Sequence, residues 1–362
     1  MLMRRNQGFT ARRISIIIVA MIAGAVAAHY SHSHTSRSSS TTQPQQQPQS
    51  QIVETGQYTL MADPPAAGHN PQSALYQLVN GAKQSVDMTM YELSDQTMVS
   101  DLIAAHKRGV DVRVLLDSAY HGKSANARDY GELQAADVSV RWAWPGVIVH
   151  QKTIVADNTA AIGTGNLTSR YYSSSRDFWI IDTNPADVRD IKATFDQDFS
   201  SSTSAPSPGV TTSGSHLLWS PGSQSALVSL IGAAEPGTTL LTESEEMNSY
   251  AIETALVSAA KRGVNVEVVM TRSSSWAAAF SKLEAAGVHV RTYPSSAQLY
   301  IHAKVVTAQT AAGPEVYVGS INYSTSSMKY NRELGVELQS PSLYSSLVGV
   351  VSGDYANAPS VG

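Results

Sequence analysis

Residues 150–157 read HQKTIVAD and are followed by a glycine-rich turn, GTGN, at residues 163–166. A second His-x-Lys sequence, HAK at residues 302–304, is followed by GSIN at residues 319–322. Each copy joins a histidine and a lysine, two residues apart, to a later turn that ends in asparagine. Because this signature occurs twice in one chain, we expect a single active site built from two similar halves.

Other segments recur at almost the same spacing. The sequence QSAL occurs at residues 72–75 and again at 224–227, an offset of 152, and KRGV occurs at 107–110 and 261–264, an offset of 154. The two signature histidines are also 152 residues apart. A register that is kept over this length predicts two homologous subdomains related by a pseudo-twofold axis, a monomer whose halves form an internal pseudo-dimer.

Each half reads as alternating strands and helices, which predicts an α/β fold. In the first half we expect helices at residues 73–80 and 97–107, and strands at residues 86–90, 110–116, 138–142, 153–156 and 178–181. The second half repeats this order over residues 239–319. We therefore expect a mixed β-sheet in each half, flanked by helices on both faces, with the signature segments near the pseudo-twofold axis.

The two signatures, His150-x-Lys152 and His302-x-Lys304, resemble the HKD motif of the phospholipase D superfamily. The resemblance extends from about Gln57 to Tyr355 and implies two tandem domains of that family's fold. It implies cleavage of a phosphodiester through a phosphohistidine, for which we take the first histidine as nucleophile and the second as acid. This chemistry needs no metal or other cofactor.

Residues of both signatures suit this chemistry. A covalent mechanism needs a nucleophile, a proton donor for the leaving alcohol, and positive charge around the phosphoryl oxygens. Lys152 and Lys304, with the amides of Asn166 and Asn322, would stabilise the phosphoryl group in the transition state. We include all of them with the two histidines as candidate catalytic residues.

Two carboxylates follow the signatures at matching places. Asp177 lies 27 residues after His150, and Glu333 lies 31 residues after His302. The resemblance implies that such an acid holds the catalytic imidazole of the opposite half, so Glu333 would orient His150 and Asp177 would orient His302. An acceptor on one ring nitrogen fixes the tautomer and raises the basicity of the other nitrogen.

Supporting roles are expected for a further set of residues. Glu92 aligns with Glu246, and both would follow an early strand close to the site; a purely structural hydrogen bond is the alternative for this pair. Ser320, in the second turn, is a further supporting candidate. Asp157 completes the first motif, but Gln309 stands at the corresponding place in the second. A degenerate second half that acts only as a scaffold therefore stays open.

The amino terminus has the pattern of a secretory signal peptide, which we place at residues 1–28. Four arginines precede an apolar run at residues 14–28 that ends in small residues. This run is shorter than the ~20 residues that cross a bilayer, so cleavage is favoured and an uncleaved anchor is the alternative. We expect a secreted or periplasmic protein.

Composition places the domain boundaries. Residues 29–51 are rich in Ser, Thr, Gln and Pro, which predicts a disordered tether. We expect the first domain at residues 52–199, a Ser/Pro-rich linker at 200–215, and the second domain at 216–362. The chain has no cysteine, which excludes disulfides and thiolate zinc sites.

Charge and aromatic residues bear on the substrate. Loss of residues 1–28, with four arginines and no acidic residue, would change the net charge from −4 to −8. Such a chain lacks the cationic field of a nonspecific nucleic-acid binder. Trp142, Trp144, Tyr171 and Tyr172 are candidates for an apolar rim that contacts a membrane surface transiently, with ordinary packing as the alternative.

We therefore favour a secreted phosphodiesterase that hydrolyses phospholipid headgroups. An extracellular, metal-independent nuclease of the same superfamily is the first alternative. A catalytically silent binding protein is the second. Cardiolipin synthesis ranks lower because the chain lacks the membrane segments that commonly accompany it. The choice between hydrolysis and transfer to an alcohol stays open.

Overall fold

The computed structural model describes residues 53–63, 71–201 and 208–361. The predicted signal peptide at residues 1–28 and the tether at residues 29–51 lie outside these ranges, and both stay predictions. Within the described ranges, none of the helices has the length and apolar character needed to cross a membrane.

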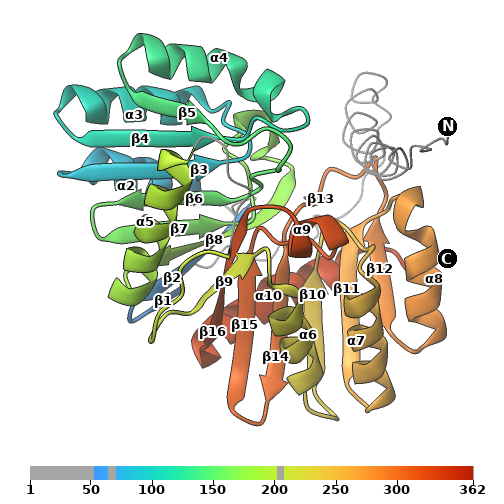
Figure 1. The fold of residues 1–362 in the computed structure, drawn as a ribbon. Coiled ribbons are helices and arrows are strands. Elements are labelled where there is room, and N and C mark those ends of the chain that lie inside the picture. Colours follow the sequence, from blue (N-terminus) through green and yellow to red (C-terminus); the bar gives the residue numbers. More distant parts are fainter. Residues whose placement is uncertain (1–52, 64–70, 202–207, 362) are drawn as a thin grey trace, which may run out of the picture.

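The first half contains a mixed sheet (Figure 1). Its strand order is β1-β2-β8-β7-β6-β3-β4-β5; β3, β4 and β5 are parallel neighbours, and the other adjacent pairs are antiparallel. The strands are β1 (Val53–Thr55), β2 (Tyr58–Asp63), β3 (Ser85–Met90), β4 (Asp111–Leu116), β5 (Ser139–Trp142), β6 (Lys152–Ala156), β7 (Thr159–Gly163) and β8 (Ser175–Asp182). The helices are α2 (Pro71–Gly81), α3 (Gln96–Lys107), α4 (Gly122–Ala135), the short η1 (Ser169–Tyr171) and α5 (Pro185–Ser200).

The second half repeats this topology. Its strand order, β12-β11-β10-β14-β15-β16-β9, matches β5-β4-β3-β6-β7-β8-β2 strand for strand. The strands are β9 (Leu217–Ser220), β10 (Thr239–Glu243), β11 (Asn265–Thr271), β12 (His289–Tyr293), β13 (Tyr300–Ile301), β14 (Val305–Thr310), β15 (Gly313–Gly319) and β16 (Glu333–Gln339). The helices are α6 (Gln224–Ala233), α7 (Tyr250–Lys261), η2 (Ser274–Trp276), α8 (Ala277–Ala285), α9 (Thr325–Lys329) and α10 (Pro341–Asn357). The predicted fold class, two homologous α/β halves, is confirmed.

The repeated KRGV sequence marks the same helix end in both halves. Helix α3 begins after Asp95, whose carboxylate accepts hydrogen bonds from two backbone N–H groups of the first turn, and it ends just before Gly109, whose φ is +89°. Helix α7 begins after Ser249, which caps the helix in the same way, and ends before Gly263 at φ +93°. Glycine is needed at both ends because other residues rarely adopt this left-handed conformation.

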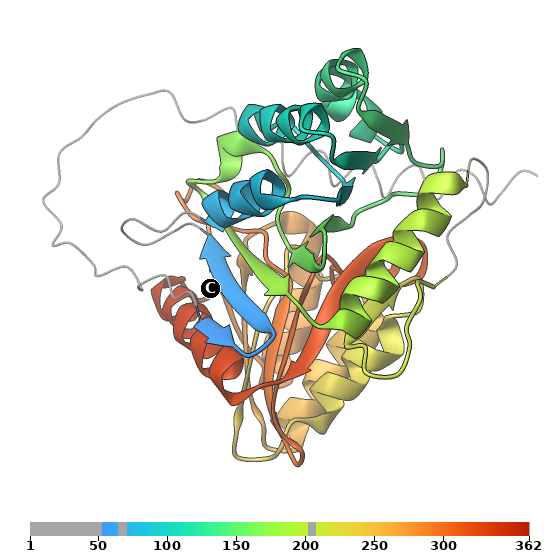
Figure 2. The ribbon, with the colours of Figure 1, turned by 90° about the vertical axis from the view of Figure 1, so that its left-hand side faces the viewer.

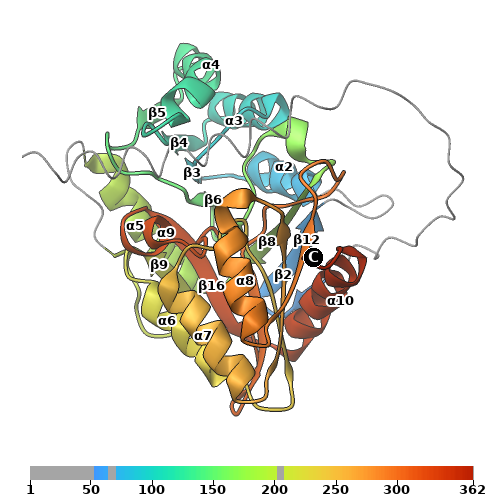
Figure 3. The same cartoon turned by 90° about the vertical axis from the view of Figure 1, so that its right-hand side faces the viewer.

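The core lies in three layers. One buried cluster lies between the first sheet and helices α2, α3 and α4, and a second lies between the second sheet and helices α6, α7 and α8 (Figure 3). A third cluster joins the inner faces of the two sheets, where Phe178 and Ile180 of β8 belong to the same core as Val318 of β15 and Leu334 of β16. The two halves therefore share a core in addition to the one that each has on its own.

The last helix of each half also contributes to this shared layer. Helix α10 lies beside β1 of the first half (Figure 2). Arg176 of β8 forms a buried ion pair with Asp354 of α10, at 3.0 Å between Nη2 and Oδ1. The matching pair joins Arg332, just before β16, to Asp198 of α5 at 2.9 Å. Both pairs run between the halves, which fixes the pseudo-twofold arrangement around the site.

Removing one member of such a pair should destabilise the protein strongly. We expect Arg332→Leu to lower the free energy of unfolding by about 3–5 kcal/mol, because it leaves the Asp198 carboxylate buried without its partner. Chemical denaturation of the purified chain measures this loss. The double variant Arg332→Leu/Asp198→Leu should recover most of it, and a single-variant loss below about 1 kcal/mol would contradict the prediction.

Candidate active site

Both signatures open into one cavity of about 470 Å³. His150 lies just before β6, and His302 lies between β13 and β14. The cavity is lined by both signature histidines, by both turn asparagines and by one of the two predicted acids: His150, His302, Asn166, Asn322 and Asp177. The remaining candidate catalytic residues, Lys152, Lys304 and Glu333, are at most 1 % exposed. The structure thus brings together every predicted catalytic residue of both halves.

Backbone hydrogen bonds hold each signature against the opposite half. The His150 N–H donates to the Arg332 carbonyl at 2.9 Å, and the His302 N–H donates to the Arg176 carbonyl at 3.2 Å. Strand β13 also pairs in parallel with β8, so a strand of the second half extends the sheet of the first. Since Arg176 and Arg332 directly precede the two acids, this pairing brings each histidine to the acid of the other half.

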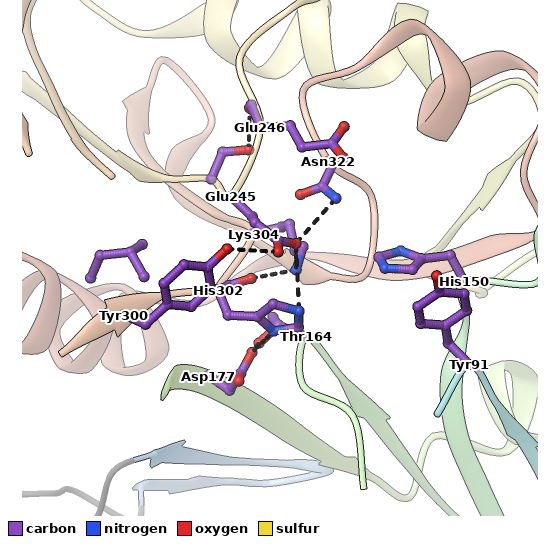
Figure 4. Close-up of polar contacts among 12 residues, drawn as sticks. Tyr91, His150, Thr164, Asp177, Glu245, Glu246, Tyr300, His302, Lys304 and Asn322 are labelled. Atoms are coloured by element: carbon purple, nitrogen blue, oxygen red, sulfur yellow. Dashed lines mark hydrogen bonds and ion pairs between the residues drawn. The ribbon is translucent and has the colours of Figure 1, made fainter. Parts of the chain in front are cut away.

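The two histidine–carboxylate pairs that the resemblance implies are present. His150 Nδ1 lies 2.8 Å from Glu333 Oε2, and His302 Nδ1 lies 2.8 Å from Asp177 Oδ1 (Figure 4 shows the latter pair). A carboxylate acceptor at Nδ1 places the ring proton there and leaves the Nε2 lone pair for chemistry. Burial, together with the two lysine ammonium groups, lowers the pKa of His150 to about 4 although Glu333 opposes this. At neutral pH His150 is therefore uncharged.

Both acids are themselves held by neighbouring side chains. The hydroxyl of Thr164 donates to Asp177 at 2.6 Å, and the amide of Asn331 donates to Glu333 at 3.1 Å. Ser320 occupies the place of Thr164 in the second half, and its hydroxyl accepts the Leu334 N–H at 3.2 Å just as the Thr164 hydroxyl accepts the Phe178 N–H at 2.9 Å. Ser320 therefore supports the backbone beside Glu333 and does not contact the carboxylate through this bond.

The two lysines have different surroundings. Lys152 Nζ donates to the His150 carbonyl at 2.6 Å and lies over the Tyr91 ring, 5.0 Å from its centroid. Burial and the nearby Lys304 lower the pKa of Lys152 to about 7. Lys304 donates to the His302 carbonyl and also pairs with Glu245, at 3.2 Å between Nζ and Oε2. Neither Tyr91 nor Glu245 was predicted from the sequence to belong to the site.

Glu92 and Glu246 both line the cavity, as expected from their alignment. Glu92 Oε1 lies 2.6 Å from His121 Nε2, a contact between two cavity-lining side chains at its mouth. Burial raises the pKa of Glu246 to about 7, and the adjacent Glu245 adds to this. For Glu92, this contact agrees with the alternative role, that of a structural hydrogen bond. Its partner His121 also lines the cavity.

Asp157 is not at the site. It follows β6 at the end opposite to Lys152, with φ +51°, and its carboxylate accepts the backbone N–H groups of Lys83, Gln84 and Ser85 at 2.8–3.0 Å. It therefore shapes the turn before β3. Gln309 lies at the same distal end of the second half, where it pairs with Pro314 in the β14–β15 hairpin.

Gln309→Asp should leave turnover within about twofold of the parent chain, because position 309 lies at the end of β14 remote from the cavity. Steady-state rates of the purified variant measure this. A loss of tenfold or more would show that the glutamine contributes to the site.

Of the four aromatic residues predicted to form a rim beside the site, two line the cavity and two do not. Tyr171 and Tyr172 line the cavity. Trp142 instead stacks on Tyr130, with ring centroids 4.2 Å apart, and Trp144 is 4 % exposed in a small core cluster. Both tryptophans are packing residues, because Trp142 stacks on a side chain of α4 and Trp144 packs with Phe195 and Phe199 of α5.

The comparisons with known proteins agree with this geometry. A family model described as cardiolipin synthase, PLD-like domain, matches residues 75–199 and again residues 227–351. Mitochondrial cardiolipin hydrolase of Xenopus laevis is 28 % identical over 118 residues, which are 32 % of this chain and 55 % of the hydrolase. Cardiolipin synthase A of Pseudomonas aeruginosa (strain LESB58) is 29 % identical over 149 residues, which are 40 % of this chain and 30 % of the synthase.

A solved structure extends the likeness over both halves. Phosphatidylserine synthase from Haemophilus influenzae Rd KW20 superposes with a TM-score of 0.62 at 12 % identity, covering 80 % of this chain and 85 % of the synthase. At this identity the likeness concerns the fold alone.

Two tandem matches that together cover more than half of the chain establish that the protein belongs to the phospholipase D superfamily. The curated relatives are matched over only 30–55 % of their own lengths.

Proposed function

We propose that this protein cleaves the headgroup phosphodiester of phospholipids through a phosphohistidine on His150. The observation that carries the proposal is the pair of histidines from opposite halves, each with a carboxylate at Nδ1, in one cavity. A secreted or periplasmic location is part of the proposal and rests on the signal sequence at residues 1–28.

The reaction would proceed in two balanced steps. Nε2 of neutral His150 attacks phosphorus, the bond from phosphorus to the headgroup oxygen breaks, and His302 donates its proton to that oxygen. His302 then removes a proton from water, the water oxygen attacks phosphorus, and the phosphorus–nitrogen bond breaks to release phosphatidic acid and His150. Lys152 and Lys304, with Asn166 and Asn322, would stabilise the charge on the phosphoryl oxygens in both steps.

The lining of the cavity supports a lipid substrate. Five tyrosines line the cavity that holds the two histidines, and Tyr171, Tyr172 and Tyr300 are among them. Such amphipathic rings suit a lipid at the boundary between water and acyl chains. Both curated relatives carry cardiolipin in their names, which also favours a phospholipid over a nucleic acid.

Transfer to an alcohol is the second candidate. One of the relatives is named a synthase and another a hydrolase, so the names weigh against the low rank that the sequence alone gave to cardiolipin synthesis. Hydrolysis and transfer share the phosphohistidine intermediate. They differ only in the acceptor of the phosphatidyl group, which is water in hydrolysis and the hydroxyl of a second phospholipid in transfer.

Activity should have an acidic optimum. His150 must be neutral to attack, so kcat/KM should be lost as the pH falls through its pKa of about 4, and an unperturbed histidine would place this limb near 6.5. The charge of Lys152 is lost as the pH rises through about 7, which should lower kcat/KM on the alkaline side. A pH profile measured where the chain stays folded tests this, and an acidic limb near pH 6.5 would contradict it.

The test of function is product analysis after incubating the purified full-length chain with mixed phospholipid vesicles and excess EDTA. Phosphatidic acid is the expected product. Cardiolipin formed from phosphatidylglycerol vesicles would instead favour transfer. Cleavage of DNA without lipid turnover would favour the nuclease, and binding without any turnover would favour the silent binding protein.

A further inference from the structure

One carboxylate of the second half contacts both His302, the proposed general acid, and the groups proposed to bind the phosphate. Glu245, in the loop after β10, is partly buried, with its side chain 15 % exposed. Its Oε2 lies 3.2 Å from Lys304 Nζ, 3.5 Å from His302 Nε2 and 3.5 Å from Asn322 Nδ2 (Figure 4). Its Oε1 accepts a hydrogen bond from the Tyr300 hydroxyl at 3.0 Å. These contacts fix the carboxylate over the Nε2 side of His302.

The first half has no carboxylate at the corresponding place. Leu93 bridges to Leu167 as Met247 bridges to Tyr323, so the residues two positions earlier, Tyr91 and Glu245, are counterparts. The Tyr91 ring packs edge-on against His150, with centroids 4.8 Å apart. The two otherwise symmetric half-sites therefore differ where the reactive nitrogen of each histidine lies.

This difference has a direct consequence for protonation. His302 faces a carboxylate from each of its two ring nitrogens, Asp177 at Nδ1 and Glu245 at Nε2. Only the imidazolium form has an N–H group toward each of them. His150 faces one carboxylate, that of Glu333 at Nδ1, and an aromatic ring, which is the environment of a neutral imidazole.

We propose that Glu245 is a positioning residue that holds His302 as the imidazolium and so assigns the acid to the second half and the nucleophile to the first. The proposal rests on the proposed phosphodiester cleavage and deepens it. The 3.5 Å separation between His302 Nε2 and Glu245 is longer than a strong hydrogen bond, so a leaving oxygen can replace the carboxylate at that N–H. The lowered pKa of His150 supports the same division of roles.

Several charged or titratable groups lie around His302. They come from β8, from the loop after β10, from β13, and from the signature itself: Asp177, Glu245, Tyr300 and Lys304. Of these, Glu245 is the group placed at Nε2, and Glu245→Gln removes its charge while keeping its size and its ability to accept from Tyr300.

The first test compares two phospholipids that differ only in the leaving group. Phosphatidylcholine releases an alkyl alcohol and needs an acid, whereas phosphatidyl-p-nitrophenol releases a phenolate and does not. For Glu245→Gln we expect kcat to fall about 10²-fold with the alkyl leaving group and less than about threefold with the aryl one. KM should stay equal or fall, since a negative charge leaves the anion site.

The pH profile provides a second readout. The alkaline limb measured with phosphatidylcholine should move to lower pH in Glu245→Gln, because the Glu245 carboxylate raises the pKa of Lys152, whose charge sets that limb. The matched control is Glu284→Gln, which removes an exposed carboxylate from α8. An equal loss with both leaving groups and an unmoved limb would show that Glu245 has only a structural role.

A measurement without turnover separates this proposal from the proposed function. In the chain labelled with ¹⁵N-histidine, the His302 signal, assigned by comparison with His302→Asn, should show two protonated ring nitrogens at neutral pH. Glu245→Gln should convert it to a neutral ring. A neutral His302 in the parent chain would overturn the proposal about Glu245 even if lipid is cleaved. An imidazolium in a chain that cleaves no phosphodiester would count against the proposed function alone.

Discussion

Replacing His150 with alanine should abolish phospholipid cleavage, with a fall in kcat of about 10⁴-fold or more. Removal of His302 should cost a similar factor with an alkyl leaving group. Each half holds only one of the two histidines, and the cavity joins them, so neither half can supply both a nucleophile and an acid. Release of phosphatidic acid from vesicles measures both variants.

The two variants should differ in one respect. With phosphatidyl-p-nitrophenol, His302→Ala should regain much of the first chemical step because that leaving group needs no proton, whereas His150→Ala should stay inactive. His289→Ala, which changes an exposed histidine on β12, is the matched control and should retain full activity. Near-full phosphatidylcholine turnover by either signature variant would disprove a site shared between the halves.

Glu333→Gln should lower kcat by about 10²–10⁴-fold while leaving the fold intact. The carboxylate is fully buried, accepts from Asn331, and holds His150 through Nδ1 at 2.8 Å. A glutamine has one acceptor oxygen, so it cannot satisfy both Asn331 and the Nδ1–H of His150. The ring would then lose the tautomer that presents a free Nε2 to phosphorus.

The control for this variant is Glu337→Gln, which neutralises another carboxylate on the same strand, β16, outside the cavity. Single-turnover rates and thermal unfolding of both chains separate a chemical loss from a loss of stability. A fall below tenfold in Glu333→Gln, with an unchanged melting temperature, would mean that the pair with His150 is not needed for attack.

Much of this architecture could be predicted from the sequence because the duplication predicts two homologous halves that share one site. Two similar motifs at nearly the same offset as the other repeats imply two similar folds, and the family resemblance implies the crossed pairs His150–Glu333 and His302–Asp177. The apolar residues of the buried strands also predicted β3 and β4 within one residue of their observed bounds. These features depend on local periodicity or on repetition, which a single sequence displays.

Glu245 and Thr164 were missed for the opposite reason. Glu245 breaks the symmetry, since its counterpart is Tyr91, and a search for repeated residues passes over it. The contact between Thr164 and Asp177 depends on how neighbouring strands β7 and β8 pair, and a hydroxyl in a turn carries no signal of this. Thr164 does, however, lie within the first glycine-rich turn, and its alignment with Ser320 is a signal that could have identified it.

Asp157 and Trp144 lie close to the first signature in sequence but not at the site in the structure. Asp157 lies only five residues after Lys152, but those residues form the extended strand β6, which carries the carboxylate to the far end of the sheet. Trp144 precedes His150 closely along the chain but is buried against Phe195 and Phe199 of α5. In an extended strand, residues a few positions apart in sequence lie far apart in space. Whether a side chain is buried depends on elements much further along the chain.

The most direct test of the shared site is to trap the covalent intermediate in the His302→Ala chain with phosphatidyl-p-nitrophenol. After denaturation, peptide mass spectrometry locates the phosphatidyl group. The account predicts that it accumulates on His150, because the group that activates water comes from the other half. A phosphatidyl group on any other residue, or turnover with no covalent intermediate, would contradict the account.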